Sequence, residues 1–464
     1  MTNEEKVKPE KKRVIRFLQN ACIICFLLCV GGLLYYGAIC PWSSNDVSIY
    51  QCYAVAFWRG WPGLQDMPSG QCDFVISQAV MSQNSLLNDM QQWKLPYCLI
   101  EFVAAQRLDQ PYHTLPREYP LLAELPFALG LIVPASWYVR AFDIEMLLLA
   151  GCIYMVLQRW RSRGAALAYS LYLMVGTVST LGARFDIIPA GLTLFAVICA
   201  ERKRWRWAFV CLALATLLKL YPVILLVPFL LAQQREITDR WYAWRRWQPM
   251  AVFVGICVLV VGASLWLNVA GTLAPLGYFT NRPVEIESLS ASKLWISSLI
   301  SKTSLEYVYS FGSINIANSS SSMPSETTAL LVVSLFSTCW LQWRGRIDLA
   351  MASLLTLLIV IVTGKVFSPQ YLIWVIPLVA YVGQSRLRWL CFWILVGLLT
   401  SWIFPFLFAN ILTFPMPYLP DGSLFNLVLT VRNLLILAFI VSMLISNSLG
   451  TTKVTGDMGM VEPV

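Results

Sequence analysis

The chain has 464 residues, of which 58% are hydrophobic and 13% are charged, and its formal net charge is +9. A soluble globular domain carries nearer to a quarter charged residues, so the composition excludes an ordinary soluble protein. The positive charge lies mostly in short loops, where it orients membrane helices, and we expect no nucleic-acid partner. We predict an all-α, polytopic protein of the cell (plasma) membrane with about 11–13 transmembrane helices.

The first part of the chain alternates between basic, apolar and polar segments. Residues 1–16 are rich in lysine and arginine and are expected in the cytoplasm, and the apolar residues 17–40 are expected to form a retained helix that runs outward. Residues 41–118 then form a large first extracytoplasmic loop, which is too long for a simple connection and is expected to contain amphipathic helices. If this loop faces an oxidising compartment, disulfides can form among Cys40, Cys52, Cys72 and Cys98, with the pairing left open.

The middle of the chain is organised by basic clusters at residues 159–163, 202–206 and 235–246, all expected in the cytoplasm. Between the last two lies one apolar stretch, broken by Lys219-Leu220-Tyr221-Pro222. Two cytoplasmic ends require an even number of crossings, so we predict a short or re-entrant hairpin with Lys219 near its outer turn. The same count places Arg184-Phe185-Asp186 outside, between two shorter helices.

One inconsistency concerns the number of crossings between Glu118, expected outside, and the basic cluster at residues 159–163. An odd number is required, yet residues 121–157 read as two apolar runs. Either one of these runs does not span the membrane, or a basic cluster breaks the positive-inside rule.

In the C-terminal half, basic clusters at residues 344–346 and 386–388 mark further cytoplasmic ends, and four apolar runs are mostly long enough to cross the membrane: residues 250–267, 330–343, 389–408 and 424–445. The segments expected outside are residues 281–325, 364–370 and 410–423. We predict a single multi-spanning domain over residues 17–446, followed by a disordered cytoplasmic tail at residues 447–464.

Polar residues of unusual type fall at or near the ends of the apolar runs on the predicted outer side. Charge at such positions is costly to keep, which points to function. We expect these side chains to line one polar cavity that opens away from the cytoplasm: Asp46, Glu118, Arg184, Asp186, Lys219, Arg282, Glu287, Lys365 and Gln370.

Two acidic positions have both a catalytic and a structural interpretation. Asp46 follows the first apolar run, where a carboxylate beside a hydrophobic cavity can accept a hydroxyl proton as a general base, although a helix cap or a solvated loop residue explains it equally simply. Glu118-Tyr119-Pro120 opens the next apolar run, and a proline and a glutamate are both favourable at a helix start.

Four cations occur at outer helix ends, against the positive-inside bias, and therefore suggest an anionic ligand such as phosphate: Arg184, Lys219, Arg282 and Lys365. The alternative is internal ion pairing with Asp186, Glu285 or Glu287. Phosphate contact is favoured for Lys219 and Lys365, which have no acid close by in the sequence, and the two interpretations are balanced for the arginines.

Other site classes lack support. His113 is the sole histidine, and the pair Cys22 and Cys25 lies inside an apolar run, so we expect no metal site. No phosphate-loop, dinucleotide-binding or zinc-peptidase motif occurs, and we expect no cofactor.

The main alternative to an enzyme is a membrane transporter or lipid flippase of a polyprenyl-linked or anionic substrate, although internal repeats are not evident. A third alternative is a binding or assembly subunit without activity.

A series of short motifs resembles glycosyltransferase family 87, the polyprenyl-phosphate-mannose-dependent mannosyltransferases of the C-type, multi-spanning class. In chain order they are Asp46 ahead of Tyr50, residues 54–60, Glu118-Tyr119-Pro120, residues 184–190, residues 218–222, residues 282–288, residues 365–371 and Arg432-Asn433-Leu434. The chain departs from the family at Leu121, where a second proline is usual, and in its long first loop, which leaves the acceptor open.

The resemblance implies an inverting transfer of a sugar, with mannose expected and arabinose as the alternative, from a polyprenyl-phosphate donor to a lipid or glycan acceptor on the extracytoplasmic face. Asp46 would be the general base and Glu118 would shape the acceptor side. The leaving phosphate would be held by Lys219 and Lys365, with Arg184 or Arg282. Substrate contacts are also expected from Tyr119, Asp186, Tyr221, Glu287 and Gln370. The polyprenyl tail would stay in the bilayer.

Overall fold

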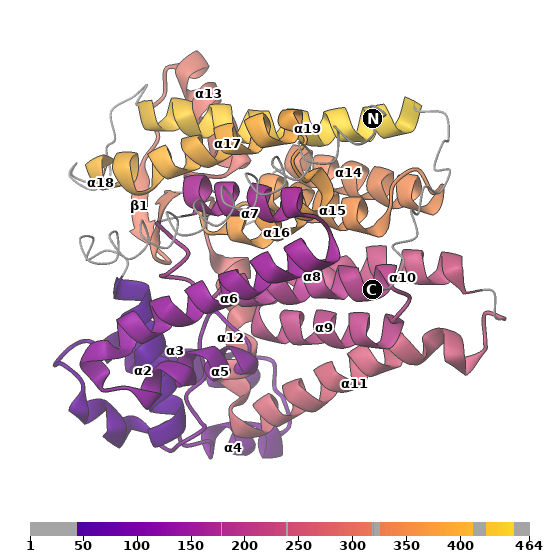
Figure 1. The fold of residues 1–464 in the computed structure, drawn as a ribbon. Coiled ribbons are helices and arrows are strands. Elements are labelled where there is room, and N and C mark those ends of the chain that lie inside the picture. The colour runs from indigo at the N-terminus through magenta and orange to yellow at the C-terminus, as the bar shows by residue number, and fades with distance from the viewer. Residues whose placement is uncertain are drawn as a thin grey trace, which may run out of the picture.

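The computed structural model describes residues 44–177, 179–237, 240–317, 319, 325–411 and 424–449. The predicted N-terminal tail at residues 1–16, the predicted first helix at residues 17–40 and residues 412–423 of the predicted outer segment lie outside this range. Of the C-terminal tail predicted at residues 447–464, residues 450–464 lie outside it, and residues 447–449 belong to a helix. The described part is almost entirely helical, with one two-stranded sheet (Figure 1). The all-α prediction is confirmed.

The first loop folds into helices, at the lower left of Figure 1. They are α2 (Ser44–Arg59), η2 (Trp61–Asp66), α3 (Asp73–Gln92) and α4 (Tyr97–Ala104). The helices predicted for this loop are therefore present. Asp46 lies in the first turn of α2, where a carboxylate interacts favourably with the helix dipole.

The segment with the uncertain number of crossings contains one long helix. Residues 121–132 form the short elements η3 (Leu121–Ala123), α5 (Glu124–Leu129) and η4 (Gly130–Ile132), followed by η5 (Ala135–Trp137) and α6 (Tyr138–Trp160). Twelve residues span about 18 Å as a helix, less than the hydrocarbon core of about 30 Å. Residues 135–160 are long and apolar enough to cross. The lengths favour the alternative in which the first run does not span.

The predicted break at Lys219 is also present. The elements are α7 (Arg163–Gly176), α8 (Ile187–Glu201), α9 (Trp205–Leu218), η6 (Tyr221–Leu225) and α10 (Leu226–Glu236). Lys219 follows the last residue of α9 with extended backbone, at φ −153° and ψ 132°, and Pro222 lies in the first turn of η6. Proline is favoured in a first helical turn because it needs no hydrogen-bond acceptor there.

The next segment contains α11 (Trp244–Leu267), α12 (Val269–Asn281), α13 (Leu289–Ser301), β1 (Tyr307–Ser310) and β2 (Ser313–Ile316). The strands pair antiparallel through the two-residue turn Phe311-Gly312, where both residues have positive φ. Such turns match the twist of the strands. The sequence did not predict this hairpin.

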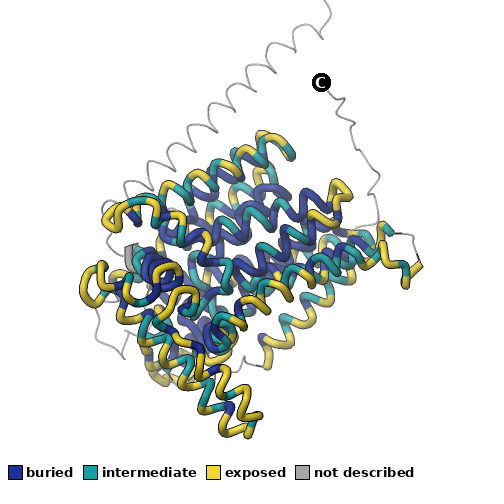
Figure 2. Tube along the Cα trace, turned by 90° about the horizontal axis from the view of Figure 1, so that it is seen from below, coloured by how far each residue is buried: buried dark blue, intermediate teal, exposed yellow. Residues whose placement is uncertain are grey.

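The remaining helices are α14 (Ser325–Trp343), α15 (Leu349–Thr363), α16 (Tyr371–Gly383), α17 (Leu387–Ser401), η7 (Trp402–Leu407), α18 (Phe408–Ile411) and α19 (Leu424–Leu449). Nearly every residue of α15 and α16 is buried, as expected for helices that are apolar on all sides. They pack on each other and against α8, α14 and α19, so they lie in the interior of the bundle. Figure 2 shows buried residues along the helices in the middle of the described part and exposed residues toward its outside.

Four described helices are long and apolar enough to cross a membrane: Ala135–Trp160, Trp244–Leu267, Leu387–Leu407 and Leu424–Ser448. Five shorter apolar helices, of 10–17 residues, accompany them. The protein is therefore a polytopic membrane protein, and the count of about 11–13 spans stays a prediction.

The bundle has two chemically different ends. The basic clusters meet at one of them, where Arg161 Nε donates to the carbonyl of Tyr381 at 3.0 Å and an Arg235 guanidinium nitrogen donates to the carbonyl of Gln342 at 2.7 Å. Helix α8 runs from Asp186 at the opposite end to Glu201 near this basic end. Its 15 residues span about 22 Å. In Figure 1 the α10–α11 connection and the β1–β2 hairpin mark opposite ends of the bundle.

Candidate functional site

A carboxylate and a guanidinium from distant segments form an ion pair at the end of the bundle away from the basic clusters. Arg184, in the loop between α7 and α8, approaches Asp46 of α2 to 2.5 Å. A second guanidinium nitrogen of Arg184 donates to the hydroxyl of Tyr50, one turn along α2, at 3.4 Å. The Asp46 side chain is 36% exposed and that of Arg184 is 21% exposed. Asp46 is therefore both held in place and open to a substrate.

Aromatic side chains form one wall behind this pair. Tyr50 stacks on Phe127 with ring centres 4.3 Å apart, and Tyr119 meets Phe185 edge-on at 4.9 Å. The hydroxyls of Tyr50 and Tyr119 lie 3.4 Å apart. The wall therefore connects α2 with Tyr119, which follows Glu118, and with the loop between α7 and α8 that carries Arg184.

A second ion pair lies deeper, behind Tyr119. Lys219 Nζ contacts Asp186 Oδ1 at 2.6 Å, with the side chains 7% and 0% exposed. The indole nitrogen of Trp374 donates to the same carboxylate oxygen. The Trp374 ring is stacked between Tyr221 at 4.0 Å and Tyr371 at 3.9 Å. Buried charge must be paired and hydrogen-bonded to persist, and Asp186 Oδ1 has both kinds of contact, while Oδ2 has no hydrogen-bond partner among the described residues.

The ammonium of Lys219 is also surrounded by aromatic faces. Its Nζ lies 5.2 Å from the ring centre of Tyr119, and 5.4 Å from those of Phe185 and Trp374. Such contacts stabilise a desolvated cation. Tyr119 and Phe185 belong to the wall behind Asp46, so the two ion pairs are adjacent parts of one cluster.

A further polar cluster joins the start of the 282–288 turn to the hairpin and to the loop before α16. Arg282 pairs with Glu285 at 3.0 Å and donates to Ser313 Oγ at 2.8 Å. Glu285 accepts a hydrogen bond from the backbone N–H of Phe367 at 2.8 Å, and its own N–H donates to the carbonyl of Lys365 at 2.9 Å. This cluster fixes the 282–285 and 365–367 segments against each other.

The two ion pairs with their aromatic wall form the first cluster, and the contacts of Arg282 and Glu285 form the second. The remaining predicted residues lie around these two clusters. Lys365 Nζ donates to the carbonyl of Thr280 at 2.8 Å, and Glu287 pairs with Arg432 at 3.2 Å. Gln370 immediately precedes α16, four residues before Trp374, so α16 connects the second cluster to the first. Glu118 lies within electrostatic range of cations from both clusters, Lys219 and Arg282.

The structure therefore gathers the predicted residues in two adjoining groups. The first holds Asp46, Tyr119, Arg184, Asp186, Lys219 and Tyr221, and the second holds Arg282, Glu287, Lys365 and Gln370, with Glu118 between them. For the cations, the ion-pair alternative applies to Arg184, Lys219 and Arg282, each of which has a carboxylate partner. The sequence favours phosphate contact for Lys219, because no acid lies close to it in the sequence; its partner Asp186 is 33 residues away.

Two residues that support the site received no role from the sequence, although Arg432 belongs to the last motif of the family series. Trp374 gave no signal, because a tryptophan in an apolar run reads as core. Arg432 did carry one, since it lies inside an apolar helix and is fully buried. A charge inside a membrane segment is costly and marks function or a specific partner.

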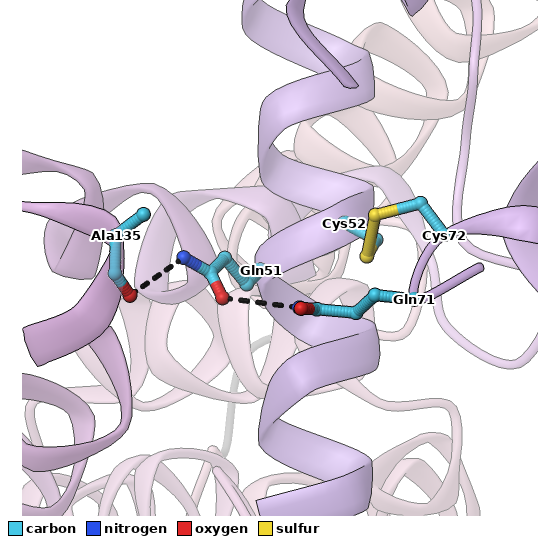
Figure 3. Close-up of a disulfide and its surroundings, with 5 residues drawn as sticks. All are labelled: Gln51, Cys52, Gln71, Cys72 and Ala135. Atoms are coloured by element: carbon cyan, nitrogen blue, oxygen red, sulfur yellow. Dashed lines mark hydrogen bonds between the residues drawn. A yellow bond between two sulfur atoms is a disulfide. The ribbon is translucent and has the colours of Figure 1, made fainter. Parts of the chain in front are cut away.

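A disulfide fixes the helix that carries Asp46. Cys52 of α2 is bonded to Cys72, which precedes α3 (Figure 3). Beside it, the amide of Gln51 donates to the carbonyl of Ala135 at 3.1 Å, and the amide of Gln71 donates to Gln51 at 3.3 Å. Of the other cysteines considered, Cys98 is free and exposed, and Cys40 lies outside the described residues.

We expect replacement of Cys52 by Ser to lower the free energy of unfolding by about 3 kcal/mol, because the bond closes a loop of 20 residues in the unfolded chain. Denaturation of the purified protein with and without reductant measures this. Cys98→Ser is the matched control and should leave stability unchanged. A Cys52→Ser protein as stable as the unreduced wild type would show that the bond does not form.

The comparison with known families matches this region of the chain. The family model for glycosyltransferase family 87 covers residues 119–369, just over half of the chain. The match includes Arg184, Asp186, Lys219, Arg282 and Lys365, and it leaves Asp46, Glu118 and Arg432 outside. Searches of curated proteins and of solved structures give no match. The helical membrane architecture and this match together establish that the chain belongs to glycosyltransferase family 87.

Proposed function

We propose that this membrane glycosyltransferase moves mannose from a polyprenyl phosphate to a hydroxyl of a lipid or glycan acceptor, on the extracytoplasmic face and with inversion. The observation that carries the proposal is the position of Asp46. Its carboxylate is partly exposed, held by Arg184, and next to a cluster that contains further cations. Attack by a hydroxyl requires a base that takes up its proton, and departure of a phosphate requires cations that stabilise its negative charge.

In the proposed reaction the acceptor oxygen forms a bond to the anomeric carbon while the bond from that carbon to the phosphate oxygen breaks. The phosphate leaves with the bonding electron pair, and Asp46 takes the proton of the acceptor hydroxyl. Attack from the face opposite the phosphate inverts the anomeric configuration. Arg184 holds the Asp46 carboxylate in one orientation, so less conformational freedom has to be lost to reach the reactive geometry.

The second cluster is the proposed place for the leaving phosphate. Arg282 is buried, and its Nε has no hydrogen-bond partner among the described residues. Lys365 lies on the adjoining loop and is only partly buried. Arginine and lysine donors are the groups that proteins use to bind phosphate. Lys219 and Arg282 are both ion-paired. The Lys219 ammonium is also enclosed by aromatic rings, whereas Arg282 keeps a donor nitrogen without a partner among the described residues, so we assign the phosphate chiefly to Arg282 and Lys365.

Two observations support an extracytoplasmic site. The basic clusters at the other end of the bundle are expected in the cytoplasm. The Cys52–Cys72 disulfide joins the helix of Asp46, and such bonds persist in oxidising compartments.

The test is transfer by the purified protein in lipid nanodiscs, with radiolabelled polyprenyl-phosphate mannose and a glycolipid extract as acceptor. We expect labelled product from this donor and none from a nucleotide-linked mannose, because the proposed site binds a lipid phosphate. Product from the nucleotide sugar alone would overturn the proposed donor. Mass spectrometry of glycolipids from cells with and without the protein then identifies the acceptor.

Sidedness can be measured with single cysteines introduced into a variant whose free cysteines are replaced. Tyr309 on the hairpin is 56% exposed, and Tyr242 in the basic α10–α11 connection is 61% exposed. A membrane-impermeant maleimide should label Tyr309→Cys in intact cells and Tyr242→Cys only after permeabilisation. Labelling of Tyr242→Cys from outside would reverse the proposed orientation.

A further inference from the structure

We infer that Arg432 is a positioning residue, which holds the two segments that carry the proposed phosphate ligands. These segments, named here the clamped loops, are residues 282–288 and 365–370. Arg432 lies on α19 and is the largest fully buried side chain in the described part of the chain. It lies outside the region matched by the family model.

The Arg432 guanidinium binds both the side chain and the backbone carbonyl of Glu287, in the first clamped loop. One guanidinium nitrogen contacts Glu287 Oε2 at 3.2 Å, and the other donates to the carbonyl of Glu287 at 2.9 Å. The amide of Asn433 donates to the same carbonyl at 3.0 Å and to Ser292 Oγ at 3.1 Å. Successive residues of α19 therefore fix one peptide group at the end of the turn that starts at Arg282.

The same guanidinium contacts the second clamped loop. It lies over the ring of Phe367, 4.0 Å from its centre. The backbone N–H of Phe367 donates to Glu285, and the carbonyl of Lys365 accepts from the N–H of Glu285. The two clamped loops and α19 are thus joined at Arg432, within a few residues of Arg282 and Lys365.

Stability alone does not account for this arrangement. A buried ion pair is often no more stabilising than a well-packed apolar pair of similar size. An apolar pair, however, cannot bind a backbone carbonyl, and lysine lacks the planar fork that reaches a carboxylate and a carbonyl together. The geometry therefore fits a residue that fixes the conformation of a loop.

The consequence for the reaction rests on the proposed function. If Arg282 and Lys365 bind the donor phosphate, release of the clamped loops should weaken donor binding more than it slows transfer. We expect Arg432→Lys to raise the donor KM, and the Kd for sugar-free polyprenyl phosphate, about tenfold, the factor for one lost hydrogen bond to a charged group. The kcat and the acceptor KM should change much less.

The experiment measures these constants for the full chain in nanodiscs, with Arg344→Lys as the matched control. Arg344 lies at the basic end, over the ring of Trp340 at 4.5 Å, and its replacement should leave all constants unchanged. A second variant, Arg432→Met with Glu287→Leu, removes both charges of the pair and guards against loss of folding in the single variant. It should fold and show the same rise in donor KM. Unchanged donor KM and Kd in either folded variant would overturn the inference.

A second readout separates this inference from the proposed function. If the wild type neither binds polyprenyl phosphate nor uses the donor, the proposed function fails, and the clamp is judged by amide hydrogen exchange. Arg432→Lys should then accelerate exchange at Ile286, whose N–H donates to the carbonyl of Ile314 in β2, and at Ser288, whose N–H donates to the carbonyl of Glu285, and not in α15. Unchanged exchange at these amides would show that Arg432 does not position the loops.

Discussion

Replacement of Asp46 by Asn should reduce sugar transfer by roughly 10²–10⁴-fold, the usual contribution of a positioned general base. Asparagine has nearly the same shape and still offers Arg184 an oxygen acceptor, but it cannot take up the hydroxyl proton. The measurement is the initial rate of product formation from radiolabelled polyprenyl-phosphate mannose.

Two controls make this result interpretable. Asp73→Asn changes an exposed carboxylate in the first turn of α3, in the same loop, and should leave the rate unchanged. Binding of polyprenyl phosphate to Asp46→Asn should stay close to that of the wild type, because the second cluster is intact. Full transfer activity in Asp46→Asn would remove this residue as the base.

The second large effect concerns the buried pair of Lys219 and Asp186. Replacement of Lys219 by Met leaves the Asp186 carboxylate buried beside Trp374 without a counter-charge, which should cost about 3–5 kcal/mol of unfolding free energy. Denaturant-induced unfolding of the purified protein, followed by tryptophan fluorescence, measures the loss.

The double variant Lys219→Met with Asp186→Leu should recover most of that stability, because no charge is then left unpaired. Lys293→Met is the matched control, since Lys293 pairs with Glu326 in a solvent-exposed position, and it should have little effect. If the double variant were as unstable as Lys219→Met, the pair would not be the source of the loss.

The sequence predicted those features that the membrane itself imposes. Apolar length identified the long helices, and the break at Lys219 and the position of Arg184 and Asp186 at the end away from the basic clusters followed from counting crossings between those clusters. These predictions use only hydropathy and charge along the chain. They needed no knowledge of how the helices pack.

The parts that could not be predicted depend on packing between distant segments. Asp186 and Lys219 are partners only because the start of α8 and the end of α9 meet, and the polar segment before α14 forms a hairpin only through its pairing and its turn. The pairing of Cys52 with Cys72, among four candidate cysteines, likewise required the fold of the first loop.

The shortness of the central helices has a consequence for the proposed lipid donor. Helix α8 covers about 22 Å, several ångströms less than the thickness of a bilayer's acyl-chain region. A site at its end is therefore recessed toward the depth at which phospholipid head groups meet the acyl chains, or the bilayer thins around it. We expect a prenyl-anchored donor to reach Arg282 and Lys365 without exposing its first isoprene units to water, while the acceptor descends from the aqueous side.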